Sequence, residues 1–115
     1  LCLYFQDISG LFPEIFKLPF EVFSLDFVMG ENNFNIIKDF PGEKELGLGL
    51  IDARNTKLEE VSDIVNGIQA MSSIVSIDKM HIHPNCGLEF LPRANAYKKL
   101  ARLVEGARKS EEVLK

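Results

Sequence analysis

The sequence predicts an α/β fold made of four strand–helix units with parallel strands. Four short apolar runs alternate with segments that carry helical spacing or helix-boundary residues, and this repetition implies helical crossovers between parallel strands. Such apolar runs are typical of strands covered on both faces. Two architectures satisfy the pattern: a doubly wound open sheet, or half of a (β/α)8 barrel. The chain has 115 residues, whereas a complete barrel needs about 250.

The first unit is predicted within residues 1–18. A strand is expected over residues 1–6 (LCLYFQ), which are aromatic and apolar. A helix is expected over residues 8–18, because proline is tolerated in a first turn and the residue before Pro19 disfavours helical geometry. The inward face of this helix should carry Leu11, Ile15 and Leu18.

The second unit combines a strand over residues 21–28 with a short helix over residues 31–40. Asn32 or Asn33 can serve as the N-cap of this helix, and Pro41-Gly42 ends it.

The third strand, ELGLGLID, alternates strictly between leucine and glycine. Its leucines are expected on one face, and Gly47 and Gly49 on the other. Glycine weakens a strand, so a pair on one face indicates close approach by a ligand or a neighbouring backbone. A crowded barrel interior without a ligand explains the pair equally well.

The clearest helix is predicted over residues 56–74, where Thr56 and Glu59 fit a capping box. A fourth strand is expected over residues 79–84 and a closing helix over residues 93–115. The apolar stripe of the helix over residues 56–74 is formed by Leu58, Val61, Val65, Ile68 and Met71. The inward residues of the closing helix should be Leu100, Leu103, Val104 and Ala107.

Composition narrows the classes of function. The formal net charge is −4 and there is no basic block, which argues against nucleic-acid binding. No apolar run approaches the roughly 20 residues that cross a bilayer, so no membrane partner is expected. Cys2 and Cys86 lie far apart and form no disulfide framework, which favours a reduced, cytoplasmic setting.

The chain opens inside an apolar, strand-like run without an initiator methionine. An edge strand without a lead-in is a liability for a natural domain, so we expect residues 1–115 to be a fragment of a longer chain. Half a barrel would expose two edge strands and an apolar interior. We therefore expect the fragment to self-associate.

Polar residues gather where the predicted strands end, which is the reactive face of parallel α/β folds. Asp26 lies near the end of the second strand, Asp52 ends the third, and Arg54 follows it. Strand ends also need turn formers and helix caps, and this alternative explains aspartate and asparagine better than it explains Arg54. We expect three of these rim residues to bind substrate: Asp52, Arg54 and Asn85.

The fourth strand and its following turn carry the residues best suited to metal or thiol chemistry. His81 and His83 are two apart on a strand and therefore share a face, as a metal-binding pair would, although strand histidines are more often packing or surface residues. Cys86 precedes a glycine in a turn, where either a functional thiol or a partly buried free cysteine is expected.

The stretch HPNCGLEFLPR, followed by a long helix, resembles the last strand of the cobalamin-independent methionine synthase family. YFQDI, LPFEVFSLDFV and GLGLIDARN resemble successive strand ends of that family, in the same order. The resemblance extends to short single-barrel archaeal-type relatives. It implies that the chain forms the C-terminal half of a TIM (β/α)8 barrel. It also implies transfer of a methyl group to the thiol of homocysteine from a methyl-folate or methyl-corrinoid donor.

The resemblance further implies a zinc ion that activates the substrate thiol. Cys86 and Asp26 match two of the family's ligand positions, whereas Leu1 and Leu3 stand where the family has histidine and cysteine, and Cys2 should point to the opposite face. Two explanations stay open. Either His83 supplies a ligand beside Cys86, or the barrel has lost its zinc.

Two further functions are compatible with the same residues. One is a related zinc-dependent thiol alkyltransferase of the uroporphyrinogen-decarboxylase-like group. The other is a degenerate, non-catalytic barrel that binds a ligand or a partner. Whichever of the three functions the full protein has, we expect the fragment alone to be inactive.

Overall fold

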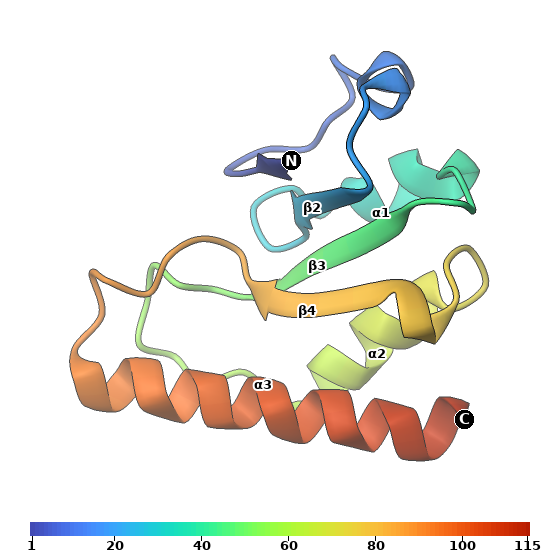
Figure 1. Ribbon diagram of the computed structural model, residues 1–115. Coiled ribbons are helices and arrows are strands. Elements are labelled where there is room, and N and C mark those ends of the chain that lie inside the picture. Colours follow the sequence, from blue (N-terminus) through green and yellow to red (C-terminus); the bar gives the residue numbers. More distant parts are fainter.

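The computed structural model describes residues 1–115 and contains one four-stranded parallel sheet. The strands are β1 (Cys2–Leu3), β2 (Val22–Asp26), β3 (Glu45–Ile51) and β4 (Met80–Pro84). They lie side by side in chain order, and every neighbouring pair is parallel (Figure 1). The predicted α/β class with parallel strands is confirmed. Strand order that never reverses is typical of a barrel, whereas a doubly wound sheet has a switch point.

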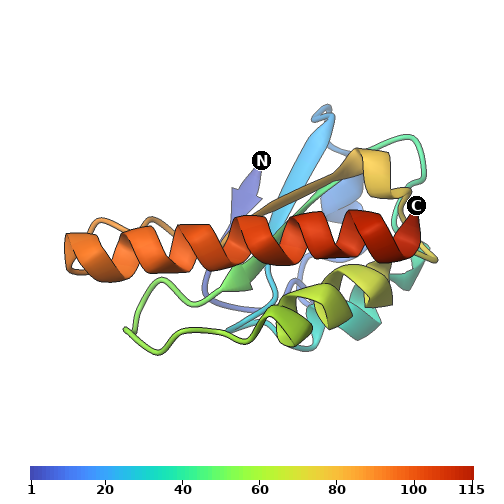
Figure 2. The same cartoon turned by 90° about the horizontal axis from the view of Figure 1, so that it is seen from below.

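The helical segments between the strands differ greatly in length. The short ones are the 3₁₀ helices η1 (Glu14–Lys17), η2 (Ile37–Asp39) and η3 (Ile77–Lys79) and the single turn α1 (Asn33–Ile36). The long ones are α2 (Val61–Met71) and α3 (Arg93–Leu114). Figure 2 shows α3 running across the whole sheet with α2 beside it. None of the helices combines the length and apolar composition needed to span a bilayer.

The two faces of the sheet differ in character. Leu46 and Leu48 are fully buried in the hydrophobic core, and Leu50 packs against Gly67 of α2. Gly47 and Gly49 lie on the other face, as predicted. A side chain built on Gly47 would meet Ser24 and His83, and one on Gly49 would meet backbone of the neighbouring strands. The glycines are therefore explained by crowding within the protein.

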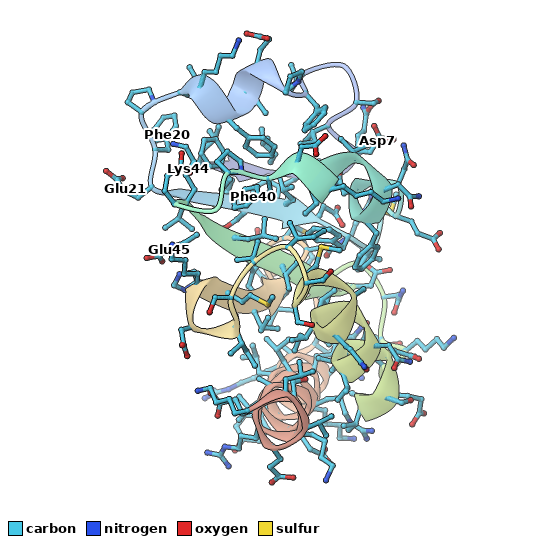
Figure 3. All side chains as sticks on the ribbon, turned by 90° about the vertical axis from the view of Figure 1, so that its right-hand side faces the viewer. Asp7, Phe20, Glu21, Phe40, Lys44 and Glu45 are labelled. Carbon is cyan, nitrogen blue, oxygen red and sulfur yellow. The ribbon has the colours of Figure 1, made fainter.

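Aromatic packing holds η1 against the amino-terminal half of the sheet. The ring of Phe16 lies 5.1 Å from that of Phe23 and 5.0 Å from that of Phe40, both in edge-to-face geometry. Lys44 donates to the carbonyl of Phe20 at 2.7 Å and thereby ties the end of this segment to the start of β3 (Figure 3).

Three predicted features of the first half and the middle of the chain are wrong. The strand expected over residues 1–6 is only two residues long, and Phe5 has a φ of 73°, which strand geometry excludes. The helix expected over residues 8–18 is a turn followed by η1, because Phe16, and not Leu11 or Leu18, enters the core. The capping box is absent: α2 starts after Glu60, and the Glu59 carboxylate accepts a hydrogen bond from the amide of Asp52.

The closing helix is present but rotated from the prediction. Leu100 and Val104 are 43% and 48% exposed. Gly106 lets α3 approach Ile64 of α2 closely, and Lys99 reaches the loop after β3. The buried residues of α3 are Lys99, Leu103, Gly106 and Ser110.

These exposed features predict association. The outer face of α3 presents Tyr97, Leu100 and Val104, and β1 and β4 are open sheet edges. We expect the isolated 115-residue chain, of 13.0 kDa, to sediment as a dimer or larger species at micromolar concentration. Leu100→Glu with Val104→Glu should shift it toward monomer, whereas Glu105→Gln should not. A parent chain that sediments as a monomer would contradict the expectation.

Candidate functional site at the carboxyl ends of the strands

The carboxylate of Asp26, at the end of β2, connects the ends of several strands. It is completely buried, and one oxygen accepts hydrogen bonds from the amides of Val28 and Met29 at 2.9 Å. The other oxygen accepts from the amide of Phe5 at 3.1 Å and from the side-chain amide of Asn85 at 3.4 Å. Four donors therefore occupy both oxygens of Asp26.

Two buried asparagines extend this network in the same manner. The Asn33 side chain accepts from the amide of Ile8 and donates to the carbonyl of Asp26, both at 2.9 Å. The Asn85 side chain accepts from the amide of Ala53 at 2.9 Å and donates to the Asp26 carboxylate. Asn85 is fully buried, and its hydrogen bonds order the strand ends. Direct contact between Asn85 and substrate stays a prediction.

The register of the strands decides which side chains share the face opposite the helices. Cys2 pairs with Ser24, which pairs with Gly47, and Asp26 pairs with Gly49, which pairs with His83. Residues paired in a parallel sheet point to the same face. Cys2 therefore lies on the face of Asp26 and His83. Leu3 pairs with Leu25 and packs against the core.

This arrangement corrects the expectation that Cys2 points away from the site. The same placement accounts for Tyr4, whose hydroxyl pKa is raised chiefly by a side-chain hydrogen bond with Cys2, with a smaller contribution from the charge of Cys86. The strand pairing that fixes the face of Cys2 could not be read from the sequence of β1 alone.

A pocket of about 510 Å³ opens where β1, β3 and β4 end. The side chain of Arg54 extends across it, with the guanidinium carbon 5.5 Å from the centre of the Phe5 ring. Arg54 is the one cation in the lining and Glu89 the one carboxylate. The lining residues are Phe5, Ala53, Arg54, Cys86, Gly87, Glu89 and Phe90.

Sequence reasoning placed Arg54 and Cys86 at this rim but missed Glu89 and Phe5. Glu89 follows the turn after β4, within the stretch HPNCGLEFLPR, but the resemblance gave it no role. Phe5 was assigned to the interior of a strand, whereas its positive φ turns the chain at the pocket edge.

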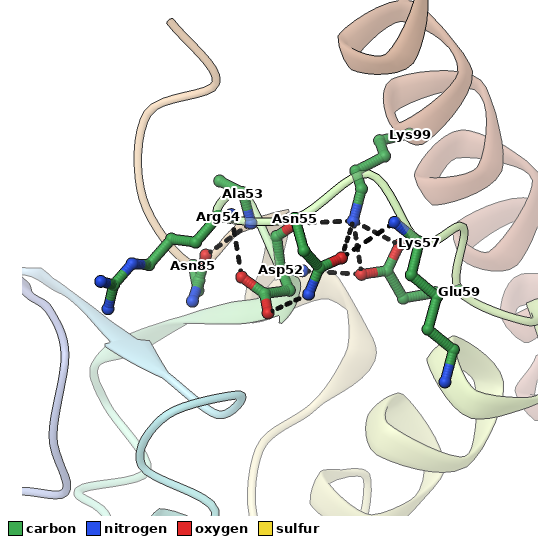
Figure 4. A network of polar contacts seen from close by, with 8 residues as sticks. All are labelled: Asp52, Ala53, Arg54, Asn55, Lys57, Glu59, Asn85 and Lys99. Carbon is green, nitrogen blue, oxygen red and sulfur yellow. Dashed lines mark hydrogen bonds and ion pairs between the residues drawn. The ribbon is translucent and has the colours of Figure 1, made fainter. Parts of the chain in front are cut away.

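The loop after β3 holds Arg54 through its backbone. One carboxylate oxygen of Asp52 accepts from the amide of Arg54 at 2.9 Å, and the other accepts from the side chain of Asn55 at 2.6 Å (Figure 4). Asp52 is thus a turn-forming residue that orients Arg54, and it does not line the pocket.

The environment of the Cys86 thiol is mainly desolvating and negative. Partial burial is the largest cause that raises its pKa, followed by the carboxylates of Asp26 and Glu89, while the guanidinium of Arg54 lowers it. These surroundings therefore disfavour the thiolate, and Arg54 is the group that opposes this.

The residues present do not fit a zinc ion. Both oxygens of Asp26 are occupied by N–H donors, and Nδ1 of His83 lies 2.6 Å from the carbonyl of Pro84. Nowhere in residues 1–115 do three His, Cys, Asp or Glu side chains group so as to hold a metal ion. The structure therefore does not assemble Cys86, Asp26 and His83 into the metal site that the sequence suggested.

The two histidines of β4 are also not a metal pair. Nε2 of His81 lies 2.5 Å from the carboxylate of Glu45 at the amino-terminal end of the sheet. Nε2 of His83 is buried without a hydrogen-bond partner and lies over Gly47. The two Nε2 atoms therefore do not face a common point: that of His81 contacts Glu45, whereas that of His83 has no partner.

Comparison with known proteins gives a consistent family. A family model described as the cobalamin-independent synthase, catalytic domain, matches residues 2–109. The chain is 38% identical over 112 residues to a methionine synthase of Saccharolobus islandicus, covering 96% of the chain and 34% of that relative. It is 32% identical over 102 residues to the methionine synthase of Methanothermobacter marburgensis, covering 88% of the chain and 33% of that relative.

A solved structure supports the same fold. The B12-independent methionine synthase from a Shewanella species superimposes with a TM-score of 0.76 at 22% identity, over 90% of this chain and 30% of that one. The chain thus spans about a third of the length of the methionine synthases it matches, 33% and 34% for the two archaeal relatives.

The network around Asp26 leads to a stability prediction. Asp26→Asn replaces one acceptor oxygen by a donor NH₂ group, which must face at least one backbone N–H. We expect the free energy of unfolding to fall by about 2–4 kcal/mol, measured by urea denaturation. Asp63→Asn, at an exposed position of α2, is the control and should change it by less than about 0.5 kcal/mol. Equal effects of the two variants would contradict the network's importance.

The charges around Cys86 lead to a prediction about pH. The rate of alkylation of Cys86 by iodoacetamide should rise with a midpoint above the ordinary thiol pKa, because burial disfavours the thiolate. Glu89→Gln removes a charge that raises this pKa and should move the midpoint to lower pH. Arg54→Gln removes the charge that lowers it and should move the midpoint to higher pH. Shifts of the same sign in both variants would show that these groups do not act on the thiol as charges.

Proposed function

Because this chain belongs to the family of the cobalamin-independent synthase catalytic domain, we propose that it is part of an enzyme that methylates the thiol of homocysteine. The thiol proton is released and a sulfur–methyl bond forms as the bond between the methyl group and its donor breaks. The donor is a methyl-folate or a methyl-corrinoid. The partners are small molecules, with no nucleic acid or membrane, in a cytoplasmic setting.

We further infer that residues 1–115 supply the last four βα units of a (β/α)8 barrel, as a fragment of a longer chain. The parallel order β1-β2-β3-β4 supports this, since it has no switch point. The matched relatives are about three times as long, which leaves room for the first four units.

The observation that carries the proposal is the pairing of Arg54 and Glu89 in one pocket beside Cys86. A free amino acid carries a carboxylate and an ammonium group at neutral pH. Arg54 suits the carboxylate and Glu89 suits the ammonium group. The related Shewanella enzyme was solved in complex with selenomethionine, an amino acid that bears a methylated selenium.

Within this pocket the residues have distinct roles. Arg54 and Glu89 bind the two charged groups of homocysteine, and Phe5 shields one side of Arg54 from water. Asp52 and Asn85 position Arg54 and the Cys86 turn from outside the pocket. No step is assigned to zinc, because the carboxylate of Asp26 is already saturated and Leu1 and Leu3 supply no ligand.

The same saturated carboxylate favours a second candidate, a barrel that binds an amino acid without methylating it. Family-type activation of the thiol needs a metal, and the donor set for that metal is missing here. The two candidates share the pocket and differ in whether a methyl group is transferred.

Binding of L-homocysteine to the full-length protein tests the shared part of both candidates. Arg54→Gln and Glu89→Gln should each weaken binding about tenfold or more, because each removes a charge-assisted hydrogen bond. Lys57→Met, a neighbouring exposed cation outside the pocket lining, should leave the affinity unchanged. Isothermal titration calorimetry measures all four proteins.

Methyl transfer separates the candidates. Formation of methionine from either donor would establish the enzyme, and binding without transfer would establish the binding module. One zinc per chain that is lost in Cys86→Ser would contradict the assignment of a metal-free pocket. Absence of homocysteine binding would contradict both functions.

A further inference from the structure

Lys99 of α3 is a buried cation that the proposed reaction does not use. Its side chain is only 1% exposed, although an ammonium group is costly to remove from water. Nζ donates to the backbone carbonyl of Asp52 at 2.6 Å and to the Glu59 carboxylate at 3.0 Å, and it lies 3.4 Å from the side-chain oxygen of Asn55. The ammonium group thus joins α3 to the loop after β3 at three points (Figure 4).

The bonds of Lys99 continue to the pocket through the loop itself. Glu59 accepts from the amide of Asp52 at 2.8 Å, so the ammonium group and Glu59 fix both backbone ends of this residue. The carboxylate of Asp52 then holds the amide of Arg54. Figure 4 shows the Arg54 side chain leaving this network on the side away from Lys99, toward the amino-terminal strands.

The geometry points to Lys99 as a positioning residue that holds Arg54 in the pocket, so that the pocket selects ligands with an anionic group. This inference rests on the proposed role of Arg54 as the cation that binds the ligand's carboxylate. The reason is physical. Arg54 is exposed and its side chain makes no hydrogen bond, so apart from the Phe5 ring its position is set by its backbone. An apolar residue at position 99 would fill the space but could not bind the carbonyl of Asp52.

Cys86 supplies a probe of this position that needs neither homocysteine nor a methyl donor. Iodoacetate is anionic and iodoacetamide is neutral, and both alkylate the same thiolate. The ratio of their rates therefore cancels the fraction of thiolate and reports the charge that the reagent meets beside Cys86. Mass spectrometry of the tryptic peptide 80–93 measures alkylation at Cys86 alone in the full-length protein.

Arg54→Gln, Lys99→Met and their combination form a double-mutant cycle with the parent protein. Arg54→Gln should lower the iodoacetate-to-iodoacetamide ratio about fivefold, the effect of one nearby charge at a partly exposed site. Lys99→Met should lower it at least about twofold when Arg54 is present and should leave it unchanged in the Arg54→Gln background. Lys98→Met, which removes an exposed lysine on the same helix turn, is the matched control and should keep the parental ratio.

Any one of three other outcomes would overturn the inference that Lys99 positions Arg54. A parental ratio in Lys99→Met, with only a lower melting temperature, would make Lys99 purely structural. An equal drop in both backgrounds would assign the effect to the charge of Lys99 itself. An unchanged ratio in Arg54→Gln would remove Arg54 as the selecting cation, whereas failure of methyl transfer alone would leave this result standing.

A second variant covers the case in which Lys99→Met does not fold. Glu59→Gln combined with Lys99→Met leaves the net charge unchanged and keeps an oxygen for the amide of Asp52, while it removes the bond to the carbonyl. The same drop in the ratio is expected, relative to Glu59→Gln alone. A ratio equal to that of Glu59→Gln would overturn the inference.

Discussion

The Asp26 carboxylate accepts hydrogen bonds from the amides of Phe5, Val28 and Met29 and from the side chain of Asn85, and most of the site's order follows from this. Parallel strands end in loops whose amides have no partner in the sheet, and a buried amide without a partner is costly. The Asp26 carboxylate accepts hydrogen bonds from four donors, and these donors belong to three different loops. The same saturation prevents Asp26 from offering an oxygen to a metal, so the stability of the rim and metal binding compete for one side chain.

The glycines of β3 show how the fold assigns its two faces. Gly47 gives space to Ser24 and His83, and Gly49 gives space to the backbone at Leu25 and Asn85. Larger residues at these positions would push β2 and β4 apart and separate Asp26 from Asn85. The alternation of leucine and glycine therefore serves both the core under the helices and the closeness of the strand ends on the opposite side.

Much of the fold could be predicted from local patterns, and the failures share a cause. β2, β3, β4 and α2 lie within the ranges where apolar periodicity placed them, because each buries apolar residues. α3 spans its predicted range but buries a different face. The errors fall where one tertiary contact overrides the local pattern. Phe16, and not Leu11 or Leu18, lies in the core. The Glu59 carboxylate bonds the amide of Asp52 and does not cap α2. The contacts of Lys99 and Gly106 rotate α3 away from its most apolar face.

The site was predictable as a location but not as a set of roles. Chain order and strand ends were sufficient to place Arg54, Asp52, Asn85 and Cys86 at one rim. The roles of Asn85 and of the loop after β3 depend on hydrogen bonds between residues 30 or more positions apart, such as Asn85 to Ala53 and Lys99 to Asp52. These bonds divide the rim into an outer group, whose polar side chains are hydrogen-bonded within the protein, and an inner group that lines the pocket. Arg54, Glu89 and Cys86 form the inner group, in which a cation and a carboxylate line the same pocket as the thiol.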